Sequence, residues 1–260
     1  MCDGVKRLFN SWVAAVISLL VSPYAVSGGL TDLEFYTEVG PPQNYEVKGK
    51  ATGIAVDLLL AASENAGDKI KPSQITVLAW DKAYQKALSE PNAVIFSAMR
   101  TKHREHLFHW VGPIQPFHVV LLARKDTQIK VAGVQDLAKY KIGVIRDDIG
   151  EQLMLDMGTP RNSLHEAADA VTLIKLLYKK RIDMIAYGES PAKYWASTVG
   201  IDHQVFESVY TLEKGELYYA LNKHIDQSLV EQLQQGIDKV KLAPDDGSAN
   251  QYDKILSKYR

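Results

Sequence analysis

The sequence predicts an α/β fold of two lobes, each a β-sheet flanked by helices. Short apolar stretches typical of strands alternate along the chain with amphipathic stretches typical of helices. The alternation falls into two series, and a chain of 260 residues is long enough to give each series its own core. Hydrophobic residues make up 46% of the chain and charged residues 23%, with 17 Gly. This composition excludes disordered, collagen-like and disulfide-stapled proteins.

The first 27 residues have the pattern of a secretory signal peptide. Lys6 and Arg7 precede an apolar stretch at 8–21, and Ala25 to Ser27 offers small residues where a signal peptidase would cleave. The alternative is an N-terminal membrane anchor, but polar residues interrupt the stretch and it is short for a membrane span. We therefore expect cleavage after residue 27. The remaining 233 residues contain no cysteine and are expected to act in a bacterial periplasm.

The first series of elements predicts a parallel sheet of three strands. Residues 33–37 alternate apolar and polar side chains, and 93–98 form an apolar stretch typical of a buried strand. Gly67 marks the end of one helix, and Asp81 can cap another. The expected order is a strand at 33–37, a helix at 54–66, a strand at 75–79, a helix at 81–88 and a strand at 93–98. Helical crossovers between the strands make this sheet parallel.

The second series predicts another sheet, followed by the elements that close the chain. Strands are expected at 117–123, 142–145 and 182–187, with helices near 134–138, near Gly150, at 169–179 and at 191–197. A strand at 217–221 and helices at 227–241 and 251–258 complete the chain. In α/β proteins of this kind, ligands bind at the carboxyl ends of the strands and in the cleft between lobes. Residues that directly follow strands are therefore the first candidates for a binding site.

The charge balance excludes nucleic acid as a partner. The chain has 30 Lys and Arg against 31 Asp and Glu, which gives a net charge of -1. Such a chain has no basic field to hold a phosphate backbone.

Several short motifs occur along the chain in a characteristic order. They are Pro41-Pro42, Gly49-Lys50, Gly53 to Leu59, Ser97 to Arg104, Asp136-Leu137, Lys141 to Val144, Arg181 to Asp183 and Tyr219 to Lys223. In order and spacing these motifs resemble the family 3 periplasmic solute-binding proteins, which serve polar amino acid ABC transporters. The resemblance implies the two-lobed periplasmic binding protein type II fold. It places a discontinuous first lobe at 28–117 plus 218–260 and a second lobe at 118–217. Two crossovers near Phe117 and Leu217 would then form the hinge.

The segment from Ser97 to Arg104 carries the main candidate for ligand binding. Arg104 lies three residues after Thr101, a natural N-cap, so its guanidinium would emerge from the first turn of a short helix. A planar guanidinium can bind a carboxylate through two parallel hydrogen bonds. The resemblance implies this role for Arg104 and a polar contact for Ser97, whereas Met99 stands where the family often has a small hydroxyl residue. The alternative is a surface arginine paired with Glu105.

The second lobe departs from the family at two positions. The family places a Gly-Thr-Thr-like turn after the strand at 142–145, but here the turn contains Asp147 and Asp148. The family Asp that grips the α-amino group of the ligand is replaced by Gly188, with Glu189 beside it. One interpretation is that Asp147, Asp148 or Glu189 supplies the anionic partner for a ligand ammonium group, because a desolvated cation needs an opposite charge. The other is that Asp148 caps the following helix.

Aromatic side chains at strand ends are further candidates. Tyr36, Trp80, Trp110 and Tyr187 lie at or just after predicted strand ends and could stack on a planar or apolar part of a ligand. The alternative for each is core packing, which we expect for Trp110, whereas Trp80 is expected to face the cleft.

We expect neither a cofactor nor a metal. His103, His106 and His109 are three residues apart, but the Trp-Val-Gly-Pro sequence from Trp110 would end a helix before the third histidine could join the others. The sequence also contains no phosphate-binding loop or nucleophile elbow.

The sequence thus predicts a monomeric periplasmic receptor that binds a small carboxylate-bearing metabolite and passes it to an ABC permease. Two alternatives remain open. The first is an enzyme that resembles cyclohexadienyl dehydratases, with Glu189 as general acid. The second is a sensory module that presents its ligand to a chemoreceptor or kinase.

Overall fold

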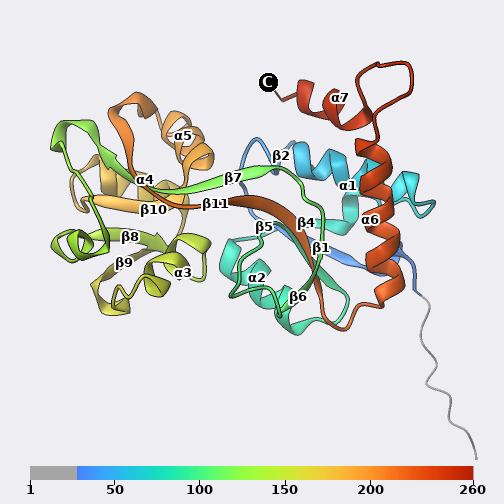
Figure 1. Cartoon of the computed structure of the whole chain (residues 1–260), viewed down its shortest axis with the longest axis horizontal. Coiled ribbons are helices and arrows are strands. Elements are labelled where there is room, and N and C mark those ends of the chain that lie inside the picture. The colour runs from blue at the N-terminus through green and yellow to red at the C-terminus, as the bar shows by residue number, and fades with distance from the viewer. Residues whose placement is uncertain (1–27, 260) are drawn as a thin grey trace, which may run out of the picture.

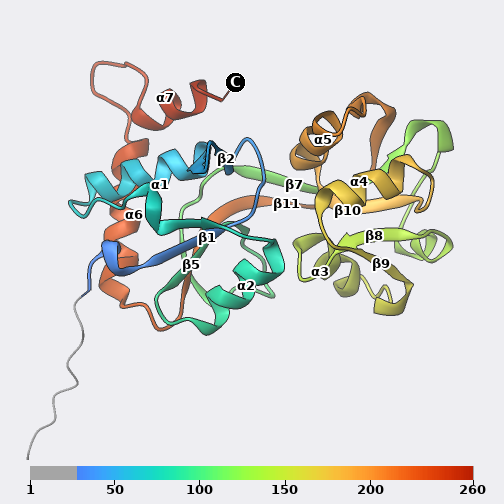
Figure 2. The ribbon, with the colours of Figure 1, turned by 180° about the vertical axis from the view of Figure 1, so that it is seen from behind.

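The computed structural model describes residues 28–259 and has two lobes joined by two long strands (Figure 1). The predicted signal peptide at 1–27 lies outside these residues. The joining strands are β7 (Pro116–Arg124) and β11 (Phe206–Asn222), which pair antiparallel from Pro116 opposite Glu216 to Arg124 opposite Phe206. Figure 2 shows both strands crossing from one lobe to the other. The predicted α/β fold with two lobes and two crossovers is confirmed.

The first lobe contains the chain's first parallel strands. β1 (Glu34–Thr37) pairs in parallel with both β4 (Ile75–Val77) and β5 (Ala93–Met99). The carboxyl-terminal part of β11 pairs antiparallel with β5 and with β6 (Phe108–Val111). The helices of this lobe are α1 (Ile54–Asn65), α2 (Trp80–Ser89), α6 (Gln227–Lys241) and α7 (Gln251–Ser257), and a hairpin of β2 (Tyr45–Val47) and β3 (Lys50–Thr52) precedes α1.

The second lobe repeats the arrangement around another parallel set. β8 (Ile142–Ile145) pairs in parallel with β9 (Leu164–Ala167) and β10 (Met184–Gly188), and β10 pairs antiparallel with β7. Its helices are α3 (Ile149–Asp156), α4 (Ala170–Tyr178) and α5 (Glu189–Thr198). Short 3-10 helices lie at Leu30–Asp32, Pro72–Gln74, Lys125–Thr127, Val134–Lys139, Arg161–Ser163 and His203–Val205. The parallel sheet predicted for the first series is therefore present, and the second series forms a sheet with both parallel and antiparallel pairs.

Most predicted elements are found within one or two residues of their expected ends, but some were missed or wrong. The strands β2, β3, β6 and β9 and the first part of β11 were missed. The first part of β11 is largely exposed and polar, so it carries no apolar pattern. The predicted helix after Thr101 is wrong, because residues 102–107 form turns. This segment is polar and lacks an apolar face that could hold a helix against the sheet.

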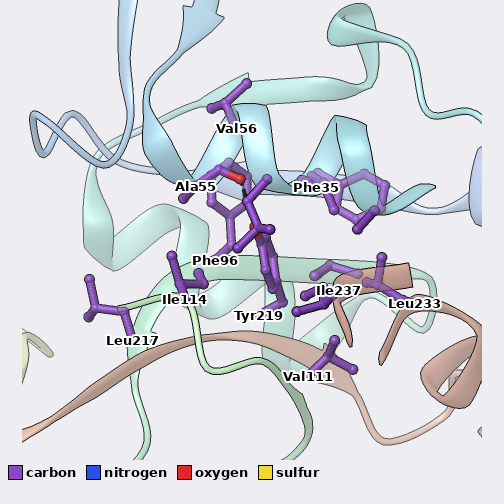
Figure 3. Close-up of a cluster of buried hydrophobic side chains, with 14 of the residues drawn as sticks. Phe35, Ala55, Val56, Phe96, Val111, Ile114, Leu217, Tyr219, Leu233 and Ile237 are labelled. Atoms are coloured by element: carbon purple, nitrogen blue, oxygen red, sulfur yellow. Dashed lines mark hydrogen bonds between the residues drawn. The ribbon is translucent and has the colours of Figure 1, made fainter. Parts of the chain in front are cut away.

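The core of the first lobe is built around Tyr219 of β11 (Figure 3). Its side chain is fully buried, its ring lies 5.8 Å from that of Phe96, and its hydroxyl donates a 2.7 Å hydrogen bond to the carbonyl oxygen of Ala55. A buried tyrosine needs such a partner, because an unpaired hydroxyl would cost free energy. This bond ties the sheet to the start of α1.

A helix that spans a membrane needs both sufficient length and sufficient hydropathy. None of the helices within residues 28–259 meets both requirements.

A glycine in α6 sets how closely this helix packs on α1. A Cβ added to Gly236 would lie 2.2 Å from the carbonyl oxygen of Ala62 in α1. Replacing a helical glycine by alanine normally stabilises a protein by about 1 kcal/mol. Here we expect Gly236→Ala to lower the free energy of unfolding by about 1 to 3 kcal/mol, because the two helices must separate.

Urea unfolding followed by circular dichroism measures this effect. Gln235→Ala is the matched control, because Gln235 is the exposed neighbour in the same helix and its change should stay within about 0.5 kcal/mol. A stabilised Gly236→Ala variant would show that the helices are not in contact at this point.

Candidate functional site

Two cavities of very different size lie where the lobes face each other. The inner cavity has a volume of about 30 Å³, enough for one or two water molecules. Its lining residues come from both lobes and are Glu38, Trp80, Ser97, Met99, Arg104, Phe117, Asp148, Ile149, Tyr187, Gly188, Pro191 and Leu217. The outer cavity, of about 910 Å³, shares Glu38 and Trp80 with the inner one. The two cavities therefore adjoin, and the inner one contains six of the ten predicted site residues.

Arg104 is held at the inner cavity by the turn that follows β5. Its backbone N–H donates to the carbonyl and to the hydroxyl oxygen of Thr101, at 3.1 and 3.3 Å. Its side chain is only 2% exposed, and the guanidinium carbon lies 5.3 Å from the ring centroid of Trp80 and 5.0 Å from that of Tyr84. Burial lowers the pKa of Arg104, although nearby acidic groups oppose this effect. The guanidinium is thus a desolvated cation in an aromatic setting.

The hydrogen bonds of this guanidinium are incomplete. Its Nη2 donates to the carbonyl oxygen of Asp147 in the second lobe, at 3.2 Å. Its Nε has no hydrogen-bond partner among residues 28–259. A buried N–H without a partner is rare in a folded protein, since it costs about 1 to 3 kcal/mol. Nε of Arg104 is therefore available to donate a hydrogen bond.

Two carboxyl groups face this cation, one from each lobe. Glu38 directly follows β1, and Asp148 occupies the N-cap position of α3. Burial and the charge of Asp148 raise the pKa of Glu38 to about 8, although Arg104 opposes the shift. Burial also raises the pKa of Asp148, against the effects of Arg104 and of the Ile149 and Gly150 amides. Oδ2 of Asp148 has no hydrogen-bond partner among the described residues.

Three other predicted residues line the same cavity. Ser97 has a φ of 59°, a left-handed conformation uncommon outside glycine, and its hydroxyl donates to Oδ1 of Asn44. Met99 is 2% exposed and fills space beside it. Tyr187 is buried, and burial together with the charges of Glu38 and Asp148 raises the pKa of its hydroxyl well above the ordinary value. The serine hydroxyl is therefore already engaged, whereas the arginine and the aspartate are not fully satisfied.

Four predicted residues lie elsewhere or take part only through their backbone. Tyr36 donates from its hydroxyl to Glu34 and Glu90, outside both cavities. Thr101 shapes the turn below Arg104, and Asp147 presents its carbonyl oxygen to the first lobe.

Glu189 is the fourth residue of this group. It forms an ion pair of 2.8 Å with Lys193 and lines a separate cavity of about 150 Å³. Trp110 lies in the first lobe, where its ring contacts those of Phe108 and Tyr218, as expected for core packing.

Sequence reasoning missed Glu38, Asn44 and Phe117. Glu38 could have been found, because it directly follows the predicted strand at 33–37. Phe117 explains the glycine at position 188, since a Cβ on Gly188 would lie 2.3 Å from Cζ of the Phe117 ring. The ring therefore takes the space that a longer side chain at 188 would need.

The lobes are held together by a few specific contacts. Nε1 of Trp80 donates to the carbonyl oxygen of Asp147 at 2.8 Å, and Nδ1 of His103 lies 3.4 Å from Oδ1 of Asp156. Ile149, the first residue of α3, packs into the apolar cluster of the first lobe. Asp147 itself has a φ of 59°, which directs its carbonyl toward Trp80 and Arg104. The turn before α3 is therefore the main contact of the second lobe with the first.

Replacing Trp80 by phenylalanine tests this contact. Trp80→Phe keeps an aromatic ring but removes the N–H that donates to Asp147, so the closed arrangement should lose about 1 kcal/mol. This corresponds to a change of about fivefold in the ratio of closed to open molecules. The distance between spin labels on Ser89→Cys and Lys179→Cys, in the protein that begins at residue 28 and has no other cysteine, reports this ratio.

Trp110→Phe is the matched control, because Nε1 of Trp110 donates to Glu105 within the first lobe, at 3.2 Å. It should change stability without changing the label distance. Equal distance distributions for Trp80→Phe and the parent protein would contradict a role for Trp80 in closure.

The histidines do not form a metal site. Within residues 28–259, no group of three His, Cys, Asp or Glu side chains is placed to hold a metal ion. His109 instead lies 3.3 Å from the carbonyl oxygen of Lys223.

Comparisons with known proteins agree with this fold. The model of the bacterial extracellular solute-binding proteins, family 3, matches residues 33–259. No curated protein matches the chain. A histidine kinase sensor domain with similarity to periplasmic binding proteins superimposes with a TM-score of 0.73 at 19% identity, covering 87% of this chain and 95% of that one.

Two further solved structures are similar to a comparable extent. The arginine-, lysine-, histidine-binding protein ArtJ of Geobacillus stearothermophilus has a TM-score of 0.70 at 18% identity, covering 87% of this chain and 94% of that one. An ancestral amino acid-binding protein, described as a precursor of cyclohexadienyl dehydratase, has a TM-score of 0.66 at 19% identity over 87% and 94% of the two chains. At identities of 18% and 19%, these similarities establish a shared fold and do not identify a ligand.

Proposed function

Because the chain belongs to the bacterial extracellular solute-binding proteins, family 3, we propose that it captures a small carboxylate-bearing metabolite between its lobes for an ABC importer. The protein would act as a monomer in the periplasm, and its closed form would be recognised by the permease in the inner membrane. The lobes would comprise residues 28–117 plus 218–260 and residues 118–217, with the hinge near Phe117 and Leu217. The amino acid-binding neighbours support a ligand of this class.

One observation carries the carboxylate assignment. Arg104 is buried between the lobes, and its Nε lacks a partner among residues 28–259. A guanidinium binds a carboxylate through two parallel hydrogen bonds, one of which can use Nε. Such a ligand would satisfy the group that is now unpaired and would replace the single bond to the carbonyl oxygen of Asp147.

Binding would require the lobes to part. The inner cavity, of about 30 Å³, is too small for an amino acid, whereas the adjoining cavity of about 910 Å³ can receive one. Opening at the hinge would move the turn at Asp147 away from Arg104 and Trp80. Ligand would first bind to the first lobe, and closure would add contacts from the second. The ligand favours closure to the extent that it binds the closed form more tightly.

A thermal-shift screen tests this proposal. A ligand that binds only the folded protein raises the melting temperature with its concentration. We expect a positive shift from at least one member of a panel of amino acids and small organic acids. A panel of polyamines, which lack a carboxylate, serves as the comparison. A response to polyamines alone would contradict the carboxylate assignment.

A sensory role is the second candidate. It is favoured by one observation, the similarity of this chain to a histidine kinase sensor domain over 87% of its length. In that case the closed form would dock on a receptor and not on a permease. Uptake of the screened ligand by cells with and without the protein separates the two roles.

The enzymatic alternative has less support. Glu189, the expected general acid, is paired with Lys193 and does not line the cavity that contains Arg104. The similarity to a dehydratase precursor concerns the fold alone. Turnover of prephenate or arogenate by the protein would revive this alternative.

A further inference from the structure

We infer that the second lobe carries a docking surface for an anionic phospholipid membrane, at the end of the lobe that lies away from the cleft. We call this surface the distal basic face and define it by six bases, Arg124, Lys125, Lys175, Lys179, Lys180 and Arg181. They come from the end of β7, and from the end of α4 with the turn that follows it. None of them lines either cavity between the lobes, so the inference does not depend on the ligand proposed above.

The distal basic face and the cleft lie at opposite ends of α4. Ala170 and Val171, in the first turn of this helix, line the outer cavity, whereas Tyr178 ends the helix at the distal basic face. The strand β7 likewise runs from the hinge through the second lobe and ends at Arg124 (Figure 1). A partner bound to this face would leave the entrance of the cleft free.

Contacts between the two elements hold the bases on one surface. Nη1 of Arg124 donates to the carbonyl oxygen of Tyr178 at 3.1 Å, and Nζ of Lys180 lies 3.3 Å from Oδ2 of Asp126. A cavity of about 540 Å³ lies between these segments and is lined by Arg124, Lys125, Asp126, Tyr178, Lys180 and Val205. The ends of β7 and α4 therefore form a single basic surface.

Most of this positive charge is not neutralised within residues 28–259. Residues 170–182 contain four bases and no acid. Asp126 is the one acid among the residues that line the cavity, and it already pairs with both Arg124 and Lys180. The other four bases of the face are exposed and form no ion pair with a described residue; they are Lys125, Lys175, Lys179 and Arg181. Because like charges repel, the face is stabilised by an anionic partner.

The turn after α4 indicates that these bases serve something other than folding. The helices α1, α3, α4 and α5 end in the same pair of backbone hydrogen bonds, donated by the two residues after the C-cap. The first of these residues has a positive φ in every case, and it is Gly67, Gly158 and Gly200 in α1, α3 and α5. In α4 it is Lys180, with a φ of 59°. Glycine is favoured in this conformation because it has no Cβ, so a lysine here weakens the fold.

Apolar side chains among the bases favour a lipid surface as the partner. Tyr178 and Val205, which line the cavity, are 49% and 36% exposed. Tyrosine is enriched where a membrane meets water, because its ring is apolar and its hydroxyl is polar. Clusters of lysine and arginine bind anionic lipid headgroups. A free phosphate ion would leave both apolar side chains in water, whereas a membrane surface accommodates them together with the bases.

The opposite charge of the cleft would orient the bound protein. Acidic residues predominate in the lining of the outer cavity, where Glu38, Glu46, Asp81, Glu166 and Asp169 stand against the single base Arg146. An anionic membrane attracts the distal basic face and repels these acids. The second lobe would therefore lie on the membrane with the cleft turned away from it. The protein would be held near its permease while the cleft stays free to take up ligand.

Cosedimentation with vesicles tests this inference. The protein that begins at residue 28 is mixed with vesicles of phosphatidylcholine alone, or of phosphatidylcholine and phosphatidylglycerol in equal parts. We expect binding only to the vesicles that contain phosphatidylglycerol. Binding should weaken as the ionic strength rises from about 0.01 M to about 0.15 M, because salt screens the charges.

A double variant tests whether the distal basic face makes this contact. Each base near an anionic membrane strengthens binding about fivefold, which corresponds to about 1 kcal/mol. The combination of Lys125→Gln and Lys179→Gln should therefore weaken binding about 25-fold. The combination of Lys71→Gln and Lys82→Gln is the matched control, because it removes the same charge from exposed positions of the first lobe. It should bind vesicles as wild type does.

Two single variants separate membrane binding from folding. Lys180→Gly should weaken vesicle binding about fivefold without lowering the melting temperature, because glycine fits the left-handed conformation better than lysine does. Tyr178→Ala should weaken binding by a factor that does not change with ionic strength, because the contact that it removes is apolar.

Three results would overturn the inference. They are equal binding to the two kinds of vesicle, binding to neither kind, and wild-type binding by the variant with Lys125→Gln and Lys179→Gln. With binding to neither kind, the bases of this face would have to serve an acidic protein. None of these results bears on the capture of a carboxylate ligand, which the thermal-shift screen measures without a membrane.

Discussion

Arg104→Ala is expected to abolish ligand-induced stabilisation of the protein. The substitution would remove both hydrogen bonds that we propose to the ligand carboxylate, and it leaves Glu38 and Asp148 without a basic side chain among the residues that line the inner cavity. Removing one partner of a buried charge pair costs about 3 to 5 kcal/mol. This corresponds to a rise of more than about 100-fold in the Kd of the ligand found by the thermal-shift screen. Isothermal titration calorimetry measures it directly.

Two further variants make this result specific. Arg104→Lys keeps the positive charge but loses the planar fork, so its affinity should lie between those of wild type and Arg104→Ala. Arg100→Ala is the matched control, because Arg100 lies in the same segment but is exposed and paired with Glu105 through Nε at 2.8 Å. It should bind as wild type does. Wild-type affinity in Arg104→Ala would refute the assignment of the carboxylate site.

Gly150→Ala is expected to destabilise the protein and to weaken ligand binding together. A Cβ on Gly150 would lie 2.0 Å from the carbonyl oxygen of Ala186 in β10, and backbone cannot move aside as a flexible side chain can. The start of α3 would shift away from the sheet and carry Asp148 with it. We expect a loss of about 3 kcal/mol in the free energy of unfolding. For a chain of this size, the loss corresponds to a fall of about 10 °C in Tm.

Gly40→Ala is the control for this prediction. Its added methyl group would meet only Nδ2 of Asn44, at an ordinary distance of 3.6 Å. Scanning calorimetry and ligand titration of both variants should show a change in Gly150→Ala alone. A Gly150→Ala variant with the Tm of wild type would mean that α3 does not lie so close to β10.

Strands that are buried on both faces could be predicted from the sequence. Strands such as β5 and β8 are continuous apolar stretches bounded by turns, and such stretches are easily recognised. The strand β9 and the first part of β11 could not be predicted in this way. Their exposed positions carry polar side chains, so these segments lack a continuous apolar stretch. They are strands because their backbones pair with the neighbouring strands β8 and β7.

The candidate site likewise contains residues that could be predicted from the sequence and residues that could not. Arg104, Trp80 and Asp148 follow strands or begin helices, so their approach to one cavity follows from the α/β arrangement. Glu189 looked equivalent in sequence, but its helix places it four residues from Lys193, with which it pairs. Such pairing depends on the direction of a side chain, which sequence position alone does not give.

A crystal structure with the strongest ligand of the thermal-shift screen tests the central claim most directly. We expect the ligand carboxylate within hydrogen-bond distance of Nε and one Nη of Arg104, with residues of both lobes around the ligand. Ligand bound away from this guanidinium, with Nη2 still donating to the carbonyl oxygen of Asp147, would contradict it.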